Sequence, residues 1–330
     1  MKPKSTTDMT PDTYLPSGVA KLVHLGIIRV TGADAASFLQ GQLTNDVQLQ
    51  KLEESRLAAF CNAKGRMQAS FVIYKRPALD DTQTTPDIYL ICSQDILPQT
   101  LKRLSMFVMR AKAKLTDVSA EFNIFGFTGN AISLIATKPI NTPATTVFNT
   151  SKVIALYPAM GQSRALCITP ANDEAPTGDA LSAELWNWGE VHAGIATITA
   201  PTFEAFVPQM LNYESVGGVN FKKGCYPGQE VVARSQFRGT LKRRAYVVQI
   251  ASNDLQPLVG QEVFHDSDAE QPCGTVVQVA KNPEKYHQTG YSAIVSMQIS
   301  AAEGGNLSLG SAGGAAITLL PLPYALLDDI

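Results

Sequence analysis

The pattern of short apolar runs changes near Arg244, and this change limits the folds open to the chain. Up to residue 200, strand-like runs such as 57–61 and 67–74 alternate irregularly with helical patterns, without a regular βα repeat. This order favours α+β layers over a doubly wound parallel sheet. After Arg244, short strand-like runs are separated by polar or glycine-rich connections, which is typical of a small closed or sandwiched β domain.

Hydrophobic periodicity and turn residues predict the individual elements. A capping-box spacing at residues 31–34 opens one helix, and Ser93 is the expected N-cap of a second helix with Pro98 near its first turn. A third helix is expected over residues 179–192, with Gly194 as its stop. Strands are expected around residues 57–61, 67–74, 87–92, 113–118, 123–127, 153–157, 165–168, 245–250, 275–280, 291–299 and 316–320, with a loop or wide hairpin over 301–316.

Composition narrows the class of protein. The 330 residues are 45% hydrophobic and 17% charged, which excludes disorder and predicts two or three folded domains. Residues 1–20 are expected to form a flexible arm, and no secretion signal is visible in them. No apolar run approaches the ~20 residues that cross a bilayer. Five scattered cysteines argue against a disulfide framework or a CxxC-type metal site, so a cytoplasmic location is expected.

Several common functions lose their main support. The sequence has no GxGxxG after a strand, no GxxxxGK[ST], no HExxH and no GxSxG, the motifs of dinucleotide, P-loop, zinc-protease and α/β-hydrolase chemistry. The formal net charge of −2 argues against a protein that chiefly coats nucleic acid.

The segment 221–230, FKKGCYPGQE, carries the strongest functional signal. Cys225 lies in a glycine-rich turn that solvent is expected to reach, and Lys222 and Lys223 favour its thiolate. Residues 229–235 continue as a short helix or a strand. These surroundings suit a reactive or ligand-capable thiol; the alternative is an ordinary turn that holds a small apolar residue.

Basic residues are concentrated in the same region. Such a stretch is suited to bind a phosphate, a carboxylate tail or an RNA backbone, although a solvated basic face is equally compatible with it. Its members are Lys222, Lys223, Arg234, Arg238, Lys242, Arg243 and Arg244.

These motifs resemble those of the YgfZ family, folate-binding proteins related to the T protein of the glycine cleavage system. The octapeptide KGCYPGQE at 223–230 is the specific part, and the likeness runs over almost the whole chain. The other matching stretches are GAD at 32–34, QGQLTND at 40–46, CNAKG at 61–65, PQML at 208–211, GGVNFK at 217–222, FRG at 237–239 and PLPY at 321–324.

The resemblance implies an α+β fold, a T-protein-like ring of three domains. Residues 21–240 are then two interleaved α+β (ferredoxin-like) folate-binding domains and residues 241–330 a C-terminal β-barrel domain, with tetrahydrofolate as the cofactor in a central cavity. It also implies a role in maintaining iron–sulfur enzymes, notably tRNA thiomethylating enzymes. The expected partners are folate, such enzymes and, as a further candidate, tRNA, but not a membrane.

The resemblance also implies which residues form the site. Cys225 takes the place of the family's functional cysteine, with Lys223 beside it. Trp186 aligns with a folate-contacting tryptophan, whose indole face suits ring stacking, although a core tryptophan is the alternative. Leu25 stands where a second family tryptophan is expected. The candidate folate-binding residues are Trp186, Leu25, Tyr226, Gln229, Glu230 and Arg234.

Two departures from the T protein bear on mechanism. The strand that begins at Gly65 (GRMQASF, 65–71) lacks the acidic residue on which aminomethyl transfer relies. His192 stands where the T protein carries a glutamate before Ala-Gly; an ordinary histidine at a helix C-terminus is the favoured interpretation of it. A standard aminomethyltransferase is therefore not expected.

Three classes of function remain. The first is a folate-binding accessory protein that supports iron–sulfur enzyme maintenance and tRNA modification, with Cys225 as functional thiol. The second is a one-carbon transferase of altered chemistry, and the third is a direct tRNA-binding protein. The missing carboxylate disfavours the second, while the acidic pI and the lack of aromatic-interleaved basic repeats disfavour the third. The first class is the hypothesis adopted.

Overall fold

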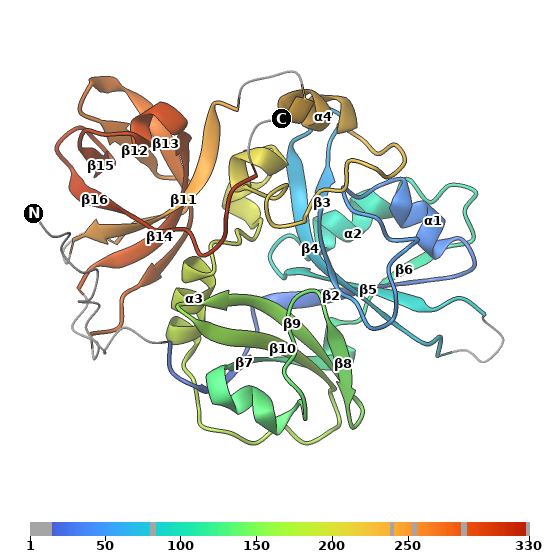
Figure 1. The fold of residues 1–330 in the computed structure, drawn as a ribbon. Coiled ribbons are helices and arrows are strands. Elements are labelled where there is room, and N and C mark those ends of the chain that lie inside the picture. Colours follow the sequence, from blue (N-terminus) through green and yellow to red (C-terminus); the bar gives the residue numbers. More distant parts are fainter. Residues whose placement is uncertain (1–14, 80–83, 238–240, 253–255, 285–288, 328–330) are drawn as a thin grey trace, which may run out of the picture.

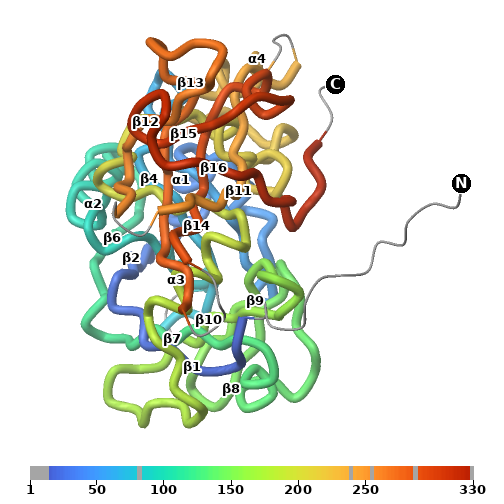
Figure 2. The backbone as a smooth tube through the Cα atoms, turned by 90° about the vertical axis from the view of Figure 1, so that its left-hand side faces the viewer, coloured from blue at the N-terminus to red at the C-terminus, as the bar shows by residue number. Residues whose placement is uncertain are grey.

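The structure is a computed structural model that describes residues 15–79, 84–237, 241–252, 256–284 and 289–327. These residues form two five-stranded antiparallel sheets and a closed six-stranded barrel (Figure 1). In the side view of Figure 2, the barrel and the first sheet lie above the second sheet. The predicted α+β fold with a C-terminal β-barrel is therefore confirmed.

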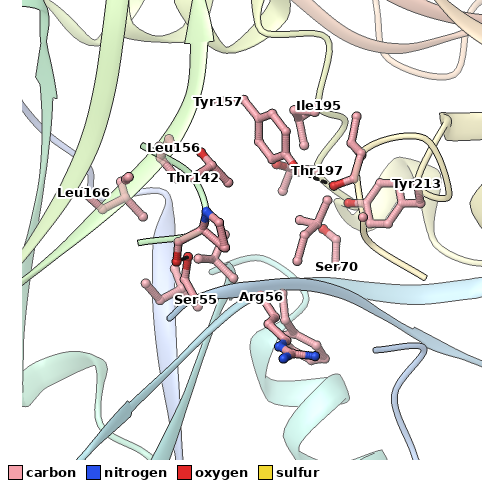
Figure 3. A pocket seen from close by; sticks show the side chains of 18 of the residues that line it. Ser55, Arg56, Ser70, Thr142, Leu156, Tyr157, Leu166, Ile195, Thr197 and Tyr213 are labelled. Atoms are coloured by element: carbon pink, nitrogen blue, oxygen red, sulfur yellow. Dashed lines mark hydrogen bonds between the residues drawn. The ribbon is translucent and has the colours of Figure 1, made fainter. Parts of the chain in front are cut away.

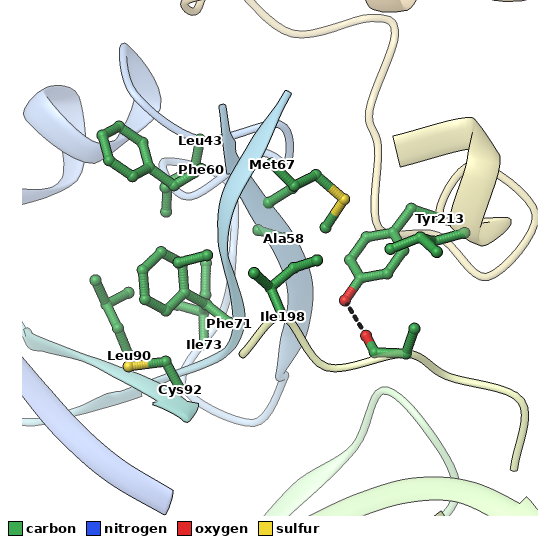
Figure 4. Packing of buried hydrophobic residues seen from close by; sticks show 14 of the residues in the cluster. Leu43, Ala58, Phe60, Met67, Phe71, Ile73, Leu90, Cys92, Ile198 and Tyr213 are labelled. Atoms are coloured by element: carbon green, nitrogen blue, oxygen red, sulfur yellow. Dashed lines mark hydrogen bonds between the residues drawn. The ribbon is translucent and has the colours of Figure 1, made fainter. Parts of the chain in front are cut away.

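The first sheet has the strand order β3-β4-β5-β2-β6. Helices α1 (Ala35–Gln40) and α2 (Leu97–Ser105) cover one of its faces, because Leu39 and Leu104 pack in one core with Phe71 of the sheet. Figure 4 shows part of this core. The strands are β2 (Leu25–Thr31), β3 (Arg56–Cys61), β4 (Met67–Arg76), β5 (Asp87–Ser93) and β6 (Lys114–Asp117).

The second sheet has the order β1-β7-β10-β9-β8. Its first strand precedes all strands of the first sheet in the chain, so the two sheet domains are interleaved. The predicted arm of residues 1–20 is too long, because β1 pairs with β7 and Leu15 is buried; residues 1–14 lie outside the described part. The strands are β1 (Gly18–Lys21), β7 (Phe122–Thr128), β8 (Thr145–Phe148), β9 (Ser151–Ala159) and β10 (Gln162–Pro170).

The two sheets face each other across a shared apolar layer. Ile27 and Tyr89 of the first sheet lie in one buried cluster with Ile154 and Leu166 of the second. This layer ends in α3 (Ala183–His192), whose Trp186 belongs to the same cluster. The face of the first sheet that α1 and α2 leave open is thus directed towards the second sheet.

Two helices follow the sheet domains. The Oγ of Ser182 accepts a hydrogen bond from the Leu185 N–H at 3.2 Å and so caps α3. Gly194, with a φ of +68°, follows the helix in the left-handed region and provides the predicted stop. Helix α4 (Gln229–Phe237) follows the segment of Cys225. Of the two alternatives expected at residues 229–235, the helix is therefore correct.

The barrel closes in the order β11-β14-β13-β12-β15-β16. It has its own core, in which Val248, Val276 and Val295 are fully buried. The strands are β11 (Arg243–Ala251), β12 (Glu262–His265), β13 (Asp268–Lys281), β14 (Tyr291–Gln298), β15 (Leu307–Leu309) and β16 (Ala315–Leu320).

Some elements differ from the predictions. Ser93 ends β5 and donates to the Asp95 carboxylate at 2.7 Å, so it does not cap α2, which begins at Leu97. The expected loop at 301–316 contains the short strand β15. Strands β1, β8, β12 and β15, of three or four residues each, were not predicted, because such short segments rarely show an alternating pattern. The equally short β6 was predicted as part of the run 113–118.

Candidate functional site

A cavity of about 580 Å³ lies where the two sheets, the connection after α3 and the C-terminal segment meet (Figure 3). This volume is within the range of small-molecule sites. Arg56 contributes to the lining, but its guanidinium extends away from Tyr157 and Tyr213, on the other side of the strand. Apolar lining comes from Leu25, Val72, Ile91, Leu156, Leu166 and Ile195, and polar lining includes Ser70, Tyr157, Arg164, Glu190, Tyr213 and Tyr324.

The ion pair of Arg164 with Glu190 forms part of the cavity wall. Nη2 of Arg164 lies 3.6 Å from Oε1 of Glu190, and Nε2 of His24 lies 3.7 Å from Oε2. Burial raises the pKa of Glu190, but hydrogen bonding from His24 and the charge of Arg164 outweigh it and leave that pKa below its ordinary value. Glu190 is thus a carboxylate held in its ionised form.

Arg164 carries unused hydrogen-bonding capacity into this cavity. Its side chain is 4% exposed, and its Nε and Nη2 atoms have no hydrogen-bond acceptor among the described residues. The guanidinium carbon lies 4.4 Å from the centre of the Trp186 ring, so one face of the group is stacked. A ligand with an acceptor atom would satisfy these donors.

The two predicted folate-contacting positions have different surroundings. Leu25 lines the cavity. Trp186 is fully buried and does not line it: the indole packs against Gly126, where an added Cβ would approach the ring to 2.3 Å, and stacks on Arg164. Trp186 therefore supports the cavity wall through Arg164.

The segment of Cys225 forms a second feature, apart from the cavity lining. Cys225 is exposed, and Lys223 is buried beside it. The Lys223 ammonium donates hydrogen bonds to the carbonyls of Gln40 and Leu43, the latter at 2.7 Å, and lies 4.8 Å from the Tyr226 ring centre. Burial lowers the pKa of Lys223 to about 8. Lys223 therefore fixes this segment to the end of α1.

The other predicted site residues follow Cys225 into α4. Tyr226 is buried, and burial raises the pKa of its hydroxyl. Gln229 is partly buried, while Glu230 and Arg234 are exposed. None of these four lines the large cavity. The structure thus groups them with Cys225 and not with Leu25.

The basic stretch is not one patch. Arg244 is buried and pairs with Glu214 at 2.6 Å, and Arg243 donates to the carbonyl of Cys273 at 2.9 Å. With Lys223 also buried, the exposed described members are Lys222, Arg234 and Lys242. Arg238 lies outside the described residues. The interpretation as a continuous basic surface is corrected accordingly.

The two departures from the T protein lie on β4 and at the end of α3. No carboxylate occurs on β4; Gln68 of this strand instead donates to Glu204 at 2.5 Å, and Glu204 does not line the cavity. Nε2 of His192 lies 3.0 Å from Oγ of Ser292, and His192 does not line the cavity either. Burial lowers its pKa to about 4, so the favourable helix-end charge expected there is not realised.

Sequence reasoning missed Arg164 and Glu190. Arg164 directly precedes the buried apolar run 165–168 of β10 and is itself buried, and this charge at the start of an apolar run is the signal that would have revealed it. Glu190 lies two residues before His192 in the segment already compared with the T protein. Among the described residues, no group of three or more His, Cys, Asp or Glu side chains is placed to hold a metal. No described helix is long and apolar enough to span a membrane.

The fold defines the class of protein. The chain matches a solved glycine cleavage system aminomethyltransferase T from Bartonella henselae with a TM-score of 0.64, over 94% of this chain and 86% of that one, at 14% identity. The fold is therefore T-protein-like.

Curated relatives show which family the chain resembles. A tRNA-modifying protein YgfZ from Colwellia psychrerythraea is 29% identical over 97% of this chain and 95% of its own length. Another from Hamiltonella defensa is 29% identical over 72% of this chain and 71% of its own length. No protein-family model matches. The resemblance to the YgfZ family is confirmed.

Proposed function

We propose that this chain is a folate-binding accessory protein that supports iron–sulfur enzyme maintenance and tRNA thiomethylation, with Cys225 as its functional thiol. Its similarity to proteins named tRNA-modifying supports the second part of this role. The T-protein-like fold and the central cavity support the first.

The pairing of Arg164 with Glu190 at the cavity wall carries the proposal. A pterin ring presents adjacent N–H donors and a carbonyl acceptor on one edge. The Glu190 carboxylate would accept from the donors, and the unsatisfied N–H groups of Arg164 would donate to the carbonyl. The apolar lining suits the remaining rings. Bound folate would supply a one-carbon carrier, which these residues hold and orient.

Titration of the purified protein with tetrahydrofolate tests the binding. Glu190→Gln removes the charged acceptor and should weaken binding by about tenfold to a hundredfold, the effect of losing a hydrogen bond to a charged group. Glu121→Gln is the matched control, because Glu121 pairs with Arg29 at 3.2 Å outside the cavity. Calorimetry that shows no saturable binding to the wild-type protein would refute the folate part.

Complementation tests the cellular role. Thiomethylated tRNA should be restored in a deletion strain by the wild-type protein and not by Cys225→Ala. Because Cys225 is exposed, this variant should fold normally, which thermal unfolding checks. Equal restoration by Cys225→Ala would show that the cysteine is only a turn residue.

A further inference from the structure

Large apolar side chains are exposed where α2 ends. Met106, Phe107 and Met109 are 70%, 44% and 88% exposed. Met109 has a φ of +43°, a left-handed conformation that costs free energy for a bulky residue. The backbone thus holds an apolar side chain in solvent at a conformational cost, although neither the core nor the cavity uses it.

This apolar turn and the segment of Cys225 both adjoin the β3–β4 hairpin, whose turn lies at residues 62–65. On one side of that turn, a Cβ on Gly65 would lie 3.1 Å from Cβ of Val231, in α4. On the other side, the ring of Phe107 lies 6.5 Å from that of Phe60, which precedes the turn.

The charges nearby also connect these segments. The pKa of Glu204 is lowered by hydrogen bonds from Gln68 and Asn62 and by the charges of Arg103 and Lys64, so α2 and the β3–β4 turn act on one carboxylate. We call the surface made by α2, the turns at 62–65 and 106–110, the segment of Cys225 and α4 the thiol face.

The described residues of the thiol face carry an excess of positive charge. Glu204, beside the face, is partly buried, and the exposed acidic residue of the face itself is Glu230. Six exposed cations of this face form no ion pair with any described residue: Lys64, Lys102, Arg103, Arg110, Lys222 and Arg234. Val231 and Phe237 are exposed between them, at 37% and 52%. A partner must therefore combine negative charge with apolar surface.

We propose that the thiol face docks a partner protein whose contact surface is acidic at its rim and apolar at its centre, and so presents that protein to Cys225. This inference rests on the proposed function, in which Cys225 acts on a client enzyme. Methionine, phenylalanine and arginine are enriched in protein interfaces, and exposed methionines adapt to different partners. RNA would instead require several aromatic stacking platforms, of which this face offers Phe107 and Phe237.

Two variants remove the docking features without removing Cys225. The double variant Arg103→Glu/Arg110→Glu reverses the charge. The variant Met109→Gly deletes the apolar side chain. Because glycine readily adopts the positive φ at this position, the stability of Met109→Gly should be unchanged or higher. Lys21→Glu/Lys138→Glu is the matched control, since both lysines are exposed on the second-sheet domain. Both test variants should lower restoration of thiomethylated tRNA by about tenfold. Their affinity for tetrahydrofolate and their melting temperature should be unchanged. The control variant should restore thiomethylated tRNA as well as the wild-type protein does.

A photo-crosslinking amino acid in place of Met109 identifies the partner in the complemented strain. The expected adduct is protease-sensitive and RNase-resistant, disappears when Arg103 and Arg110 are reversed, and joins residue 109 to an acidic peptide of the partner. An RNase-sensitive adduct would overturn the inference. Binding of the purified protein to unfractionated tRNA or to phosphatidylserine vesicles would also overturn it if that binding depends on these arginines. Normal activity of both variants would overturn it too. If neither the wild-type protein nor any variant restores thiomethylated tRNA but the expected adduct forms, the proposed cellular role is refuted and the docking inference is supported.

Discussion

Cys225 differs from the other four cysteines in its exposure. Cys61, Cys92, Cys167 and Cys273 are buried. The first three lie in or at the ends of the apolar strand-like runs 57–61, 87–92 and 165–168, where a cysteine is expected to be a buried small hydrophobe. Burial raises the pKa of the Cys61 and Cys92 thiols to about 12 and also raises those of Cys167 and Cys273. Because the thiolate is the reactive form and a reagent must reach it, Cys225 is the one exposed thiol among the described residues.

One cysteine should therefore react quickly with an aromatic disulfide reagent near neutral pH. The absorbance change should correspond to one thiol per chain in the native protein and to five after denaturation. Cys225→Ser should abolish the fast phase without changing the melting temperature. A fast thiol that persists in this variant would contradict the assignment.

At the scale of elements, His192 connects α3 to the barrel. Its Nε2 lies 3.0 Å from Oγ of Ser292 in β14, and its ring packs edge-on against Trp188 at 4.9 Å between centres. Burial lowers the pKa of His192 from 6.5 to about 4. The folded protein thus holds this histidine neutral over a range in which the unfolded chain binds a proton.

This contact should make stability depend on pH. Because the unfolded state binds more protons at this group, the contribution of His192 to the free energy of unfolding should be constant above about pH 6.5. It should fall as the pH drops towards 4, by roughly 3 kcal/mol in total. Urea unfolding at several pH values measures this change. His192→Gln, which keeps a polar group opposite Ser292, should flatten that part of the profile; an unaltered profile would assign the dependence to other groups.

At the scale of the whole molecule, the C-terminal segment returns from the barrel to the cavity. The Tyr324 hydroxyl lines the cavity, donates to the Gly194 carbonyl at 2.7 Å and accepts from Nδ2 of Asn212 at 3.3 Å. Further along, the Leu327 carbonyl accepts from Nη2 of Arg244 at 2.9 Å. This segment therefore ties the barrel to the centre of the molecule.

Removal of the Tyr324 hydroxyl should weaken that connection. Tyr324→Phe removes the donor to the buried Gly194 carbonyl, whereas Nδ2 of Asn212 still donates to the Ala245 carbonyl at 2.8 Å. The free energy of unfolding should fall by about 1–3 kcal/mol. Tyr246→Phe is the control, because the Tyr246 hydroxyl makes no hydrogen bond with a described residue. Denaturant titration compares the two variants, and equal stabilities would show that the hydroxyl contributes nothing to the tie.

The sequence by itself determined the elements that alternation and turn chemistry encode. The long strands β4, β9 and β14 have regular apolar patterns, Gly194 stops α3, and the barrel begins where the character of the chain changes. The motif around Cys225 and the burial of the strand cysteines were also predictable, because both depend on immediate neighbours.

Only the tertiary structure decided which polar residues meet. Arg164 and Glu190 come from a strand and a helix of different local pattern, and they become a pair because the two sheets close around a cavity there. Arg244 lies in a basic stretch of the sequence, yet its partner Glu214 turns it inward. Hydrophobic periodicity indicates which face of a single segment is buried. Which residues line a cavity depends instead on contacts between segments far apart in the chain.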